Sequence, residues 1–204
     1  IRARDNVMSR SRRLSSLVCL LFGLMLAGIP ALALAASPDG DREKIRNQSE
    51  QVLAKLYEAQ PSARKAIADS SGYATFSKWG LTLGPVGAGI GRGLAVAQPS
   101  GAETFMRYVE GSAGAGFGAK KYALIFVFEN EAARLNFINN GWEAGAQTTF
   151  AAKQGGAGRA YDGAASVSPG VWVYQVTDKG LAAEVGVKGT KYYKDKALNA
   201  VPGE

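Results

Sequence analysis

Glycine alternates with other residues in one short segment of the chain, and this alternation limits the folds that the segment can adopt. Gly87, Gly89, Gly91 and Gly93 take every second position, with Ala, Ile and Arg between them. Successive side chains of a β-strand point to opposite faces, so all four glycines would lie on one bare face. We therefore predict a strand whose bare face either lets another element pack closely or forms the floor of a shallow groove for an acyl chain.

Nucleotide binding is another chemistry that glycine-rich segments suggest, because glycine-rich turns cradle phosphates. The dinucleotide motif G-x-G-x-x-G needs Gly or Ala at its sixth position, whereas counting from Gly87 or Gly89 gives Arg92 or Leu94. The phosphate-loop motif G-x-x-x-x-G-K-[ST] is absent from the sequence. The segment therefore does not predict a nucleotide site, and we expect no cofactor.

The inventory of reactive side chains excludes several kinds of active site. Histidine is absent, and the one cysteine, Cys19, lies in an N-terminal apolar segment. Beyond that segment the chain can form no His or Cys zinc site, no thiolate nucleophile and no Ser-His-Asp triad. Carboxylates such as Glu103, Asp162 and Glu184 remain, but their spacing does not indicate general acid–base chemistry. We predict no catalytic residue, no metal site and no enzyme activity.

The N-terminus has the three parts of a signal peptide. A basic segment after Met8, the natural start, is followed by an apolar run over 17–29 and then by small residues. Ala33-Leu34-Ala35 matches the small-x-small cleavage site, which predicts cleavage between Ala35 and Ala36. The apolar run is shorter than the ~20 residues of a membrane span. We therefore predict export to the bacterial periplasm or envelope, with residues 1–35 removed and a single domain over 36–204.

Two further features bear on the destination and the partners. Val18 stands before Cys19, where a lipoprotein signal needs a small residue, so a lipid anchor is not predicted. Residues 1–35 hold five Arg and one Asp, which leaves 19 basic and 16 acidic residues in 36–204, a net charge of +3. This balance gives no strong attraction to a polyanion, so nucleic acid is not a predicted partner.

Residues 36–204 read as an N-terminal helical part followed by a β-rich part. A helix capped by Asp39 or Asp41 is predicted to run to about Ala59, and a shorter one from Pro61 to about Ser70. In the first helix one face carries Ile45, Ser49, Val52, Leu53 and Leu56. That face either packs on the domain or docks on a membrane. Strands are predicted at about 72–79, 84–97, 103–117, 120–129, 143–152, 171–178 and 181–189.

Turn and cap residues complete the predicted fold. Pro99-Ser100-Gly101 and Asp178-Lys179-Gly180 are hairpin turns, and Asn130 caps a helix that ends at Asn139-Asn140-Gly141. The run from Tyr122 to Phe128 lacks alternation, which indicates a strand covered on both faces. Gln154 to Ser168 is rich in Gly and Ala and reads as a mobile surface loop. The predicted class is α+β, with N-terminal helices on a mostly antiparallel, glycine-rich β-sheet or partly closed barrel.

The order of these features resembles the SYLF domain family, from about residue 45 to 199. The resembling segments are Ala66 to Gly72, Gly84 to Gly93, Gly111 to Gly118, the apolar strand, the helix over 130–137, and Tyr174 to Thr190. The resemblance implies lipid binding; some eukaryotic members of the family also bind phosphoinositides and associate with actin, but a periplasmic location argues against an actin role here. Phosphoinositide binding in the family is attributed to a basic amphipathic N-terminal helix, whereas Asp39 to Glu58 holds four basic and five acidic residues. That helix is therefore not predicted to attract an anionic surface.

A second candidate for membrane contact lies near the C-terminus. Four lysines surround an aromatic pair, in the set Lys188, Lys191, Tyr192, Tyr193, Lys194 and Lys196. Lys and Tyr suit an interface because an apolar stem carries a polar tip. A solvated charged terminus would also explain the cluster. Lys78-Trp79 and Lys120-Lys121 are weaker candidates of the same kind.

Together these observations predict a non-enzymatic protein that binds lipid or a membrane surface, with anionic headgroups as one possible partner. The predicted binding residues are the glycine segment with Arg92 (Gly87, Gly89, Gly91, Arg92, Gly93) and the C-terminal cluster. The alternative is a structural or protein-interaction protein of the envelope with no lipid ligand, in which the glycine face serves packing alone. No protein partner is identified by the sequence.

Overall fold

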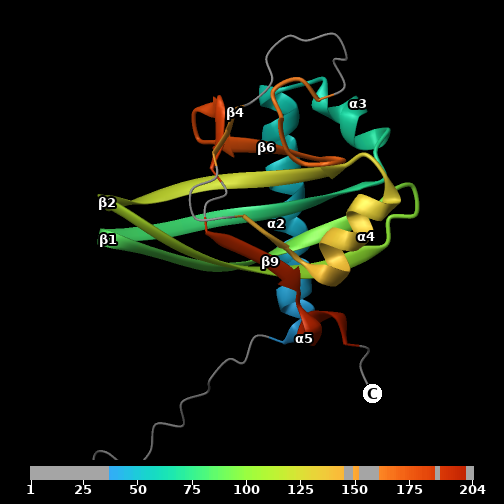
Figure 1. Cartoon of the computed structure of the whole chain (residues 1–204). Helices are drawn as coiled ribbons and strands as arrows, with labels where there is room; N and C mark the ends of the chain where they lie inside the picture. The colour runs from blue at the N-terminus through green and yellow to red at the C-terminus, as the bar shows by residue number, and fades with distance from the viewer. Residues whose placement is uncertain (1–36, 145–148, 152–160, 187–188, 201–204) are drawn as a thin grey trace, which may run out of the picture. The chain divides into compact units, whose positions relative to one another are not determined.

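The computed structural model describes residues 37–144, 149–151, 161–186 and 189–200. The predicted signal peptide and Lys188 lie outside these residues. Figure 1 shows the arrangement of the described part, a curled antiparallel sheet with helices on its faces. The predicted α+β class, with a partly closed sheet, is confirmed.

Helix α2 (Pro38–Ala59) has Ser37 as its N-cap, two residues before Asp39 and four before Asp41, the predicted caps. The Ser37 hydroxyl accepts a hydrogen bond from the Gly40 amide at 3.1 Å. Asp39 and Asp41 lie instead in the first turn, where their charge stabilises the helix N-terminus. The prediction of a capping aspartate was therefore wrong, while the predicted C-terminal end of the helix was right.

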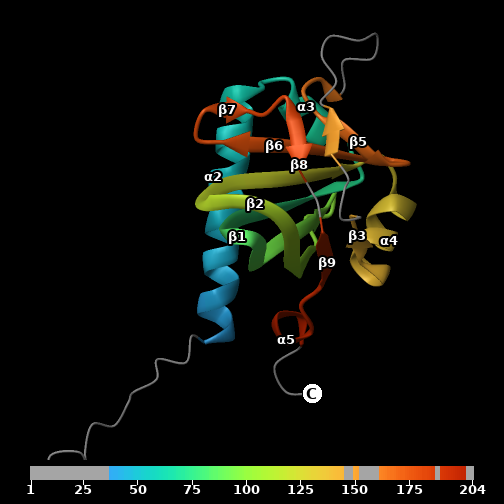
Figure 2. The same cartoon turned by 60° about the vertical axis from the view of Figure 1, so that its left-hand side comes forward.

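One face of α2 packs on the sheet, as the first interpretation of its apolar stripe predicted. Ile45, Ser49, Val52 and Leu56 are buried. The Thr75 hydroxyl donates to the Ser49 hydroxyl at 2.8 Å. Figures 1 and 2 show the helix crossing the strands. After it, α3 (Ala63–Ala68) is a shorter form of the predicted second helix.

Two long strands, β1 (Gly72–Ala97) and β2 (Glu103–Phe128), form the main antiparallel hairpin. Each merges two predicted strands, because the glycine-rich middle keeps pairing while it bends. The register shifts between Gly84 and Val86, as at a β-bulge, and Figure 1 shows both strands turning back on themselves. The predicted turn Pro99-Ser100-Gly101 closes the hairpin, where the Gly101 amide donates to the Ala97 carbonyl at 2.9 Å.

The remaining elements are α4 (Glu131–Asn140), β3 (Trp142–Glu143), β4 (Thr149–Ala151), β5 (Ala165–Ser168), β6 (Val171–Thr177), β7 (Gly180–Leu181), β8 (Glu184–Gly186), β9 (Thr190–Lys194) and α5 (Lys196–Asn199). Seven strands form one sheet with the order β3-β9-β2-β6-β5, in which β1 pairs with β2 and β7 with β6. Strands β4 and β8 form a separate pair. The sheet curls because β2 pairs with β9 over 106–110 and with β6 over 122–128.

The predicted caps of α4 and the predicted turn at Asp178-Lys179-Gly180, between β6 and β7, are confirmed. The Asn130 side chain accepts from the Ala133 amide at 2.9 Å, and Gly141 ends the helix with a φ of 75°. Thr177 and Gly180 pair across the turn between β6 and β7. The prediction of a loop over 154–168 is wrong at its C-terminal end. Residues 165–168 form strand β5, which pairs with β6, and Ala165 is buried. Residues 154–160 lie outside the described part.

Among the described residues, two of the three hydrophobic clusters lie on the two faces of the sheet, and the third joins Ile45 of α2 to Leu94 and Phe105. The first is aromatic and includes Phe76, Phe126, Phe137 and Tyr192. The second lies beneath α2 and includes Leu56, Ile125 and Tyr174. Residues 124, 126 and 128 of β2 enter the first core and residues 123, 125 and 127 the second, so the strand predicted to be covered on both faces is confirmed.

Candidate functional site

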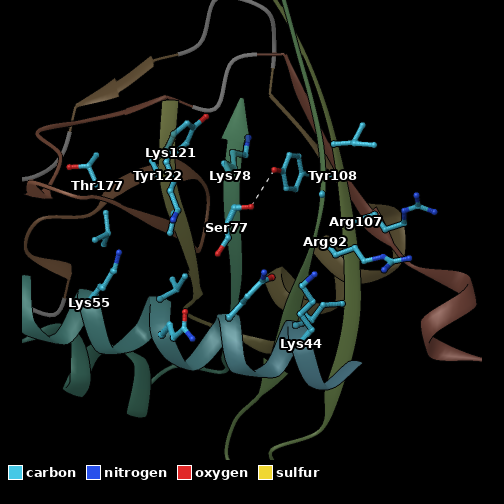
Figure 3. Close-up of a pocket in the computed structure, with 18 of the residues that line it drawn as sticks. Lys44, Lys55, Ser77, Lys78, Arg92, Arg107, Tyr108, Lys121, Tyr122 and Thr177 are labelled. Atoms are coloured by element: carbon cyan, nitrogen blue, oxygen red, sulfur yellow. Dashed lines mark hydrogen bonds between the residues drawn. The ribbon is translucent and has the colours of Figure 1, made fainter. Parts of the chain in front are cut away.

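A pocket lies between α2 and the sheet and is the candidate site. Its volume is about 720 Å³. Its lining comes from α2, both halves of β1, both halves of β2, and the end of β6. Figure 3 shows side chains from the helix and from the strands converging on this space. The volume falls within the range of ~300–1,000 Å³ that small-molecule sites occupy.

The helix contributes a polar stripe to the pocket. Lys44, Gln48, Gln51 and Lys55 recur at helical spacing and line it, next to the buried stripe that holds α2 on the sheet. Because the apolar stripe fixes the rotation of the helix, the polar stripe lies at the mouth of the pocket. The sequence carried this spacing, but the predicted sites did not include it.

Positive charge dominates the pocket. Six cationic side chains line it, namely Lys44, Lys55, Lys78, Arg92, Arg107 and Lys121. Four carboxylates pair with members of this set, namely Asp41, Glu110, Asp178 and Asp195. Within the described residues, Lys44 and Lys121 have no ion-pair partner. The pocket therefore has an excess of two positive charges.

Arg92 and Arg107 lie at the end of the pocket where α2 begins. Arg92 donates to Asp41 of α2 at 2.6 Å and lies 3.4 Å from Asp195. Arg107 lies 3.8 Å from the same Asp195 carboxylate, whose side chain is 2% exposed. These ion pairs tie the helix to the sheet. At the other end, Lys55 lies 3.5 Å from Asp178 in a solvent-exposed pair, which adds little stability.

One hydrogen bond in the pocket lining joins the first half of β2 to the first half of β1. The Tyr108 hydroxyl donates to the Ser77 carbonyl at 3.2 Å, as the dashed line in Figure 3 shows. Gly91 makes room for the ring, because a Cβ at this position would lie 2.5 Å from Tyr108 Cε1. The missing side chain at Gly91 is thus a packing requirement.

Behind Tyr108 the Lys78 ammonium is buried. Its Nζ donates to Glu110 and to the Thr190 hydroxyl, each at 2.9 Å. It also lies 4.9 Å from the ring centroid of Tyr108 and 5.1 Å from that of Tyr192. Burial lowers the pKa of Lys78, and the Glu110 carboxylate opposes this effect. The charge therefore supports the core and is not free for a ligand.

Beside the pocket, the outer face of β1, β2 and β9 presents an exposed row of side chains. Ile90 is 78% exposed and Val109 opposite it is 43% exposed. In the same register Val109 pairs with Lys191, and Arg107 pairs with Tyr193. We call Ile90, Val109, Arg107, Lys191 and Tyr193 the outer row. It combines apolar, aromatic and cationic groups on one surface.

The structure separates the residues that the sequence grouped together. In the C-terminal cluster, Tyr192 is fully buried in the aromatic core, whereas Lys191, Tyr193, Lys194 and Lys196 are exposed. In the glycine segment, Cβ atoms at Gly91 and Gly93 would meet Tyr108 and Phe76, while Arg92 faces α2. Gly87 and Gly89 pair with Ser112 and Glu110 of β2.

Two searches of the described residues are negative. No group of three or more acidic or sulfur side chains is placed to hold a metal ion over these ranges. In the same part of the chain, no helix is both long enough and apolar enough to span a membrane.

Comparison with known proteins gives two findings. Residues 109–201 match the Ysc84 family, described as "Las17-binding protein actin regulator". The Beta cell expansion factor A of Aeromonas veronii is 31% identical over 157 residues. That alignment covers 77% of this chain and 58% of the relative, so the chain spans little more than half of that protein's length.

Proposed function

The chain carries a domain of the Ysc84/SYLF family, and from that premise we propose that it is a non-enzymatic protein that binds lipid at a membrane surface. The observation that carries the proposal is the outer row. Val109 of β2 lies between exposed Ile90 of β1 and Lys191 of β9, and Arg107 and Tyr193 pair two residues further along the same strands. An apolar centre with cationic and aromatic neighbours suits the headgroup region of a membrane.

The electrostatic part of the row favours anionic headgroups. Lys191 lies 3.7 Å from Glu143, and both side chains are more than half exposed. Such a pair is weak in water, so the lysine can turn to a membrane phosphate at little cost. Lys194 and Lys196, further along the chain, are also exposed. Each basic residue close to an anionic membrane contributes roughly 1 kcal/mol to binding.

Liposome co-sedimentation tests the proposal. Binding of the full chain to anionic vesicles should exceed binding to zwitterionic vesicles and should fall with added salt. The variant Lys191→Gln should weaken binding by about fivefold. The charge-matched control Lys179→Gln changes an exposed lysine outside the row and should leave binding unchanged. All variants share the N-terminal apolar segment, so its contribution cancels.

A second variant tests the contribution of the apolar side chains of the outer row. Ile90→Ser with Val109→Ser should weaken vesicle binding without reducing its dependence on salt, because it removes buried area and no charge. If no variant changes binding, the row is not the membrane contact. If the unchanged chain binds no vesicle of any composition, an interaction with a protein partner becomes the leading function.

We also propose that the protein is exported, on the basis of the N-terminal signal sequence. Expression in a bacterium with fractionation of the envelope should yield a product that begins at Ala36. A product in the cytoplasm with its leader intact would contradict export.

A further inference from the structure

The pocket beneath α2 has two lysines without an ion-pair partner among the described residues, and they lie at its two ends. Lys44 is three residues after Asp41, whose carboxylate pairs with Arg92 at 2.6 Å. Figure 3 shows Lys44 on the same side of the pocket as Arg92 and Arg107. Lys44 therefore belongs to the end where α2 begins.

Lys121 belongs to the opposite end. The residue after it, Tyr122, pairs with Thr177 in the register of β2 and β6. The residue after Thr177 is Asp178, which lies 3.5 Å from Lys55 of α2. Figure 3 shows Lys55, Lys121 and Thr177 toward that end. The excess positive charge of the pocket is thus divided between two places.

The distance between the ends decides which ligands can compensate both lysines. Lys44 and Lys55 are 11 residues apart on α2. At ~1.5 Å per residue this separates the two ends by roughly 16 Å. A single anion, or an amphiphile with one charged head, would compensate one end alone. An extended chain that rises ~3.3 Å per residue covers the distance in about five residues.

The rest of the lining suits a peptide. Gln48 and Gln51 line the pocket from positions of α2 between Lys44 and Lys55. A glutamine amide both donates and accepts hydrogen bonds, as a peptide backbone does, whereas a bare anion needs donors alone. Apolar side chains complete the lining, namely Ile45, Val52, Ala123 and Val176. They offer surfaces for the side chains that alternate with the amides of an extended chain.

We propose that the pocket binds an extended acidic segment of a partner protein, with two carboxylate side chains about five residues apart. One carboxylate lies at Lys44 and the other at Lys121. Side chains five residues apart on an extended chain point to opposite faces. This arrangement suits the two lysines, because Lys44 belongs to the helix and Lys121 to the sheet. The inference does not depend on lipid binding at the outer row, since neither lysine belongs to that row.

Calorimetric titration of the full chain with blocked hexapeptides tests the proposal. The first probe, acetyl-ESVSVE-amide, carries glutamates five positions apart. The second, acetyl-SVEESV-amide, has the same composition with adjacent glutamates, and the third, acetyl-QSVSVQ-amide, is uncharged. We expect one copy of the first probe to bind per chain, about fivefold tighter than the second and tenfold or more tighter than the third. Equal affinity of the first two probes, or no binding of the first, overturns the proposal.

Two small anions test for a different ligand class. Inorganic phosphate carries its charge at one point, and glutarate has two carboxylates too close together to reach both ends. Both should bind at least tenfold more weakly than the first hexapeptide. Affinity equal to that of the hexapeptide would assign the pocket to a small anion and overturn the proposal.

Three kinds of variant locate the site. Lys44→Gln and Lys121→Gln should each weaken binding of the first hexapeptide about fivefold, and their effects should add because the two lysines lie far apart. Lys191→Gln makes the same change of charge outside the pocket and should leave this affinity unchanged. Asp178→Asn removes a carboxylate that lines the pocket and frees Lys55, so it should tighten binding about twofold, an effect that misfolding cannot produce. Equal losses in Lys191→Gln and in the pocket variants would overturn the assignment.

The outcomes also separate this inference from the proposed function. Weaker vesicle binding in Lys191→Gln with unchanged titration of the hexapeptide supports two independent surfaces. Vesicle binding by the unchanged chain without any titration of the hexapeptide leaves the outer row in place and overturns the peptide site. Titration of the hexapeptide without vesicle binding supports the peptide site and contradicts lipid binding at the outer row.

Discussion

Gly93 lies against Phe76, although both residues belong to β1. A Cβ built on Gly93 would overlap the Phe76 ring and the Thr75 carbonyl oxygen. The two halves of one strand therefore touch at this glycine, and the contact closes the curl of the sheet over the aromatic core. Close packing, one of the two interpretations of the alternating glycines, accounts for Gly91 and Gly93.

The variant Gly93→Ala should lower the free energy of unfolding by about 3 kcal/mol, because Phe76 is fully buried and cannot move aside. Urea unfolding followed by tryptophan fluorescence measures this loss. The control is Gly111→Ala, also in the main hairpin, where a Cβ would meet nothing within 4 Å. That change should stay within about 0.5 kcal/mol. Equal losses in the two variants would contradict a steric role for Gly93.

Removal of the buried Lys78 ammonium should destabilise the fold strongly. Its side chain is 1% exposed and that of Glu110 is 20% exposed. Lys78→Met leaves Glu110 without its cation, which should cost about 3 kcal/mol in urea unfolding. Lys65→Met, which breaks an exposed pair with Asp69, should change stability by about 0.5 kcal/mol or less.

A second change checks the cause of that loss. Glu110→Gln added to Lys78→Met removes the unpaired charge and should restore part of the stability. If the double variant is as unstable as the sum of the two single variants, Lys78 and Glu110 do not stabilise each other, and the interpretation of the pair is wrong.

Alkaline pH should unfold the protein through its buried tyrosines. Burial raises the pKa of Tyr122, Tyr174 and Tyr192 above the ordinary value of 10.0. Their stabilising contribution is fully present below pH 10.0 and is lost as the pH rises through the folded-state pKa values. The lowered pKa of Lys78 has the opposite sign, since the unfolded lysine binds more protons below 10.5, but one lysine opposes three tyrosines. Tyrosinate absorbance and circular dichroism should therefore change together.

The variant Tyr174→Phe tests the contribution of one buried tyrosine to alkaline unfolding. Among the described residues, the Tyr174 hydroxyl is buried without a hydrogen-bond partner. Its removal should leave stability at neutral pH equal or higher and move the alkaline transition to higher pH. A transition at unchanged pH would show that Tyr174 does not contribute to alkaline unfolding.

Asp195 joins the C-terminal helix to the two arginines of the pocket. It caps α5 by accepting from the amides of Ala197 at 3.1 Å and Leu198 at 3.3 Å. Asp195→Ala removes both the cap and the carboxylate that faces Arg92 and Arg107, so it should cost about 2–3 kcal/mol in thermal unfolding. Asp195→Asn keeps a capping oxygen and should cost less. Equal costs would mean that the cap contributes nothing.

Features that depend on near neighbours in the chain could be predicted from the sequence. Asn130 caps its helix because a short side chain reaches an amide three residues on, and Tyr122 to Phe128 is apolar throughout because both faces of that strand are covered. The cap of α2 was misplaced because Ser37, Asp39 and Asp41 are all good capping residues, and local chemistry alone does not choose between them.

The site depended on the tertiary structure. Adjacent Tyr192 and Tyr193 look equivalent in the sequence, yet the first is buried and the second exposed, because pairing of β9 with β2 sets which residues point into the core. Lys44, Ile90 and Lys121 lie far apart in the chain and share one pocket only because β1 and β2 bend back beneath α2. The sequence by itself determined the alternating glycines that permit this bend and the apolar stripe that seats the helix. Only the folded sheet decided which cations would be paired and which two would face an open cavity, since pairing depends on distances that the order of residues does not contain.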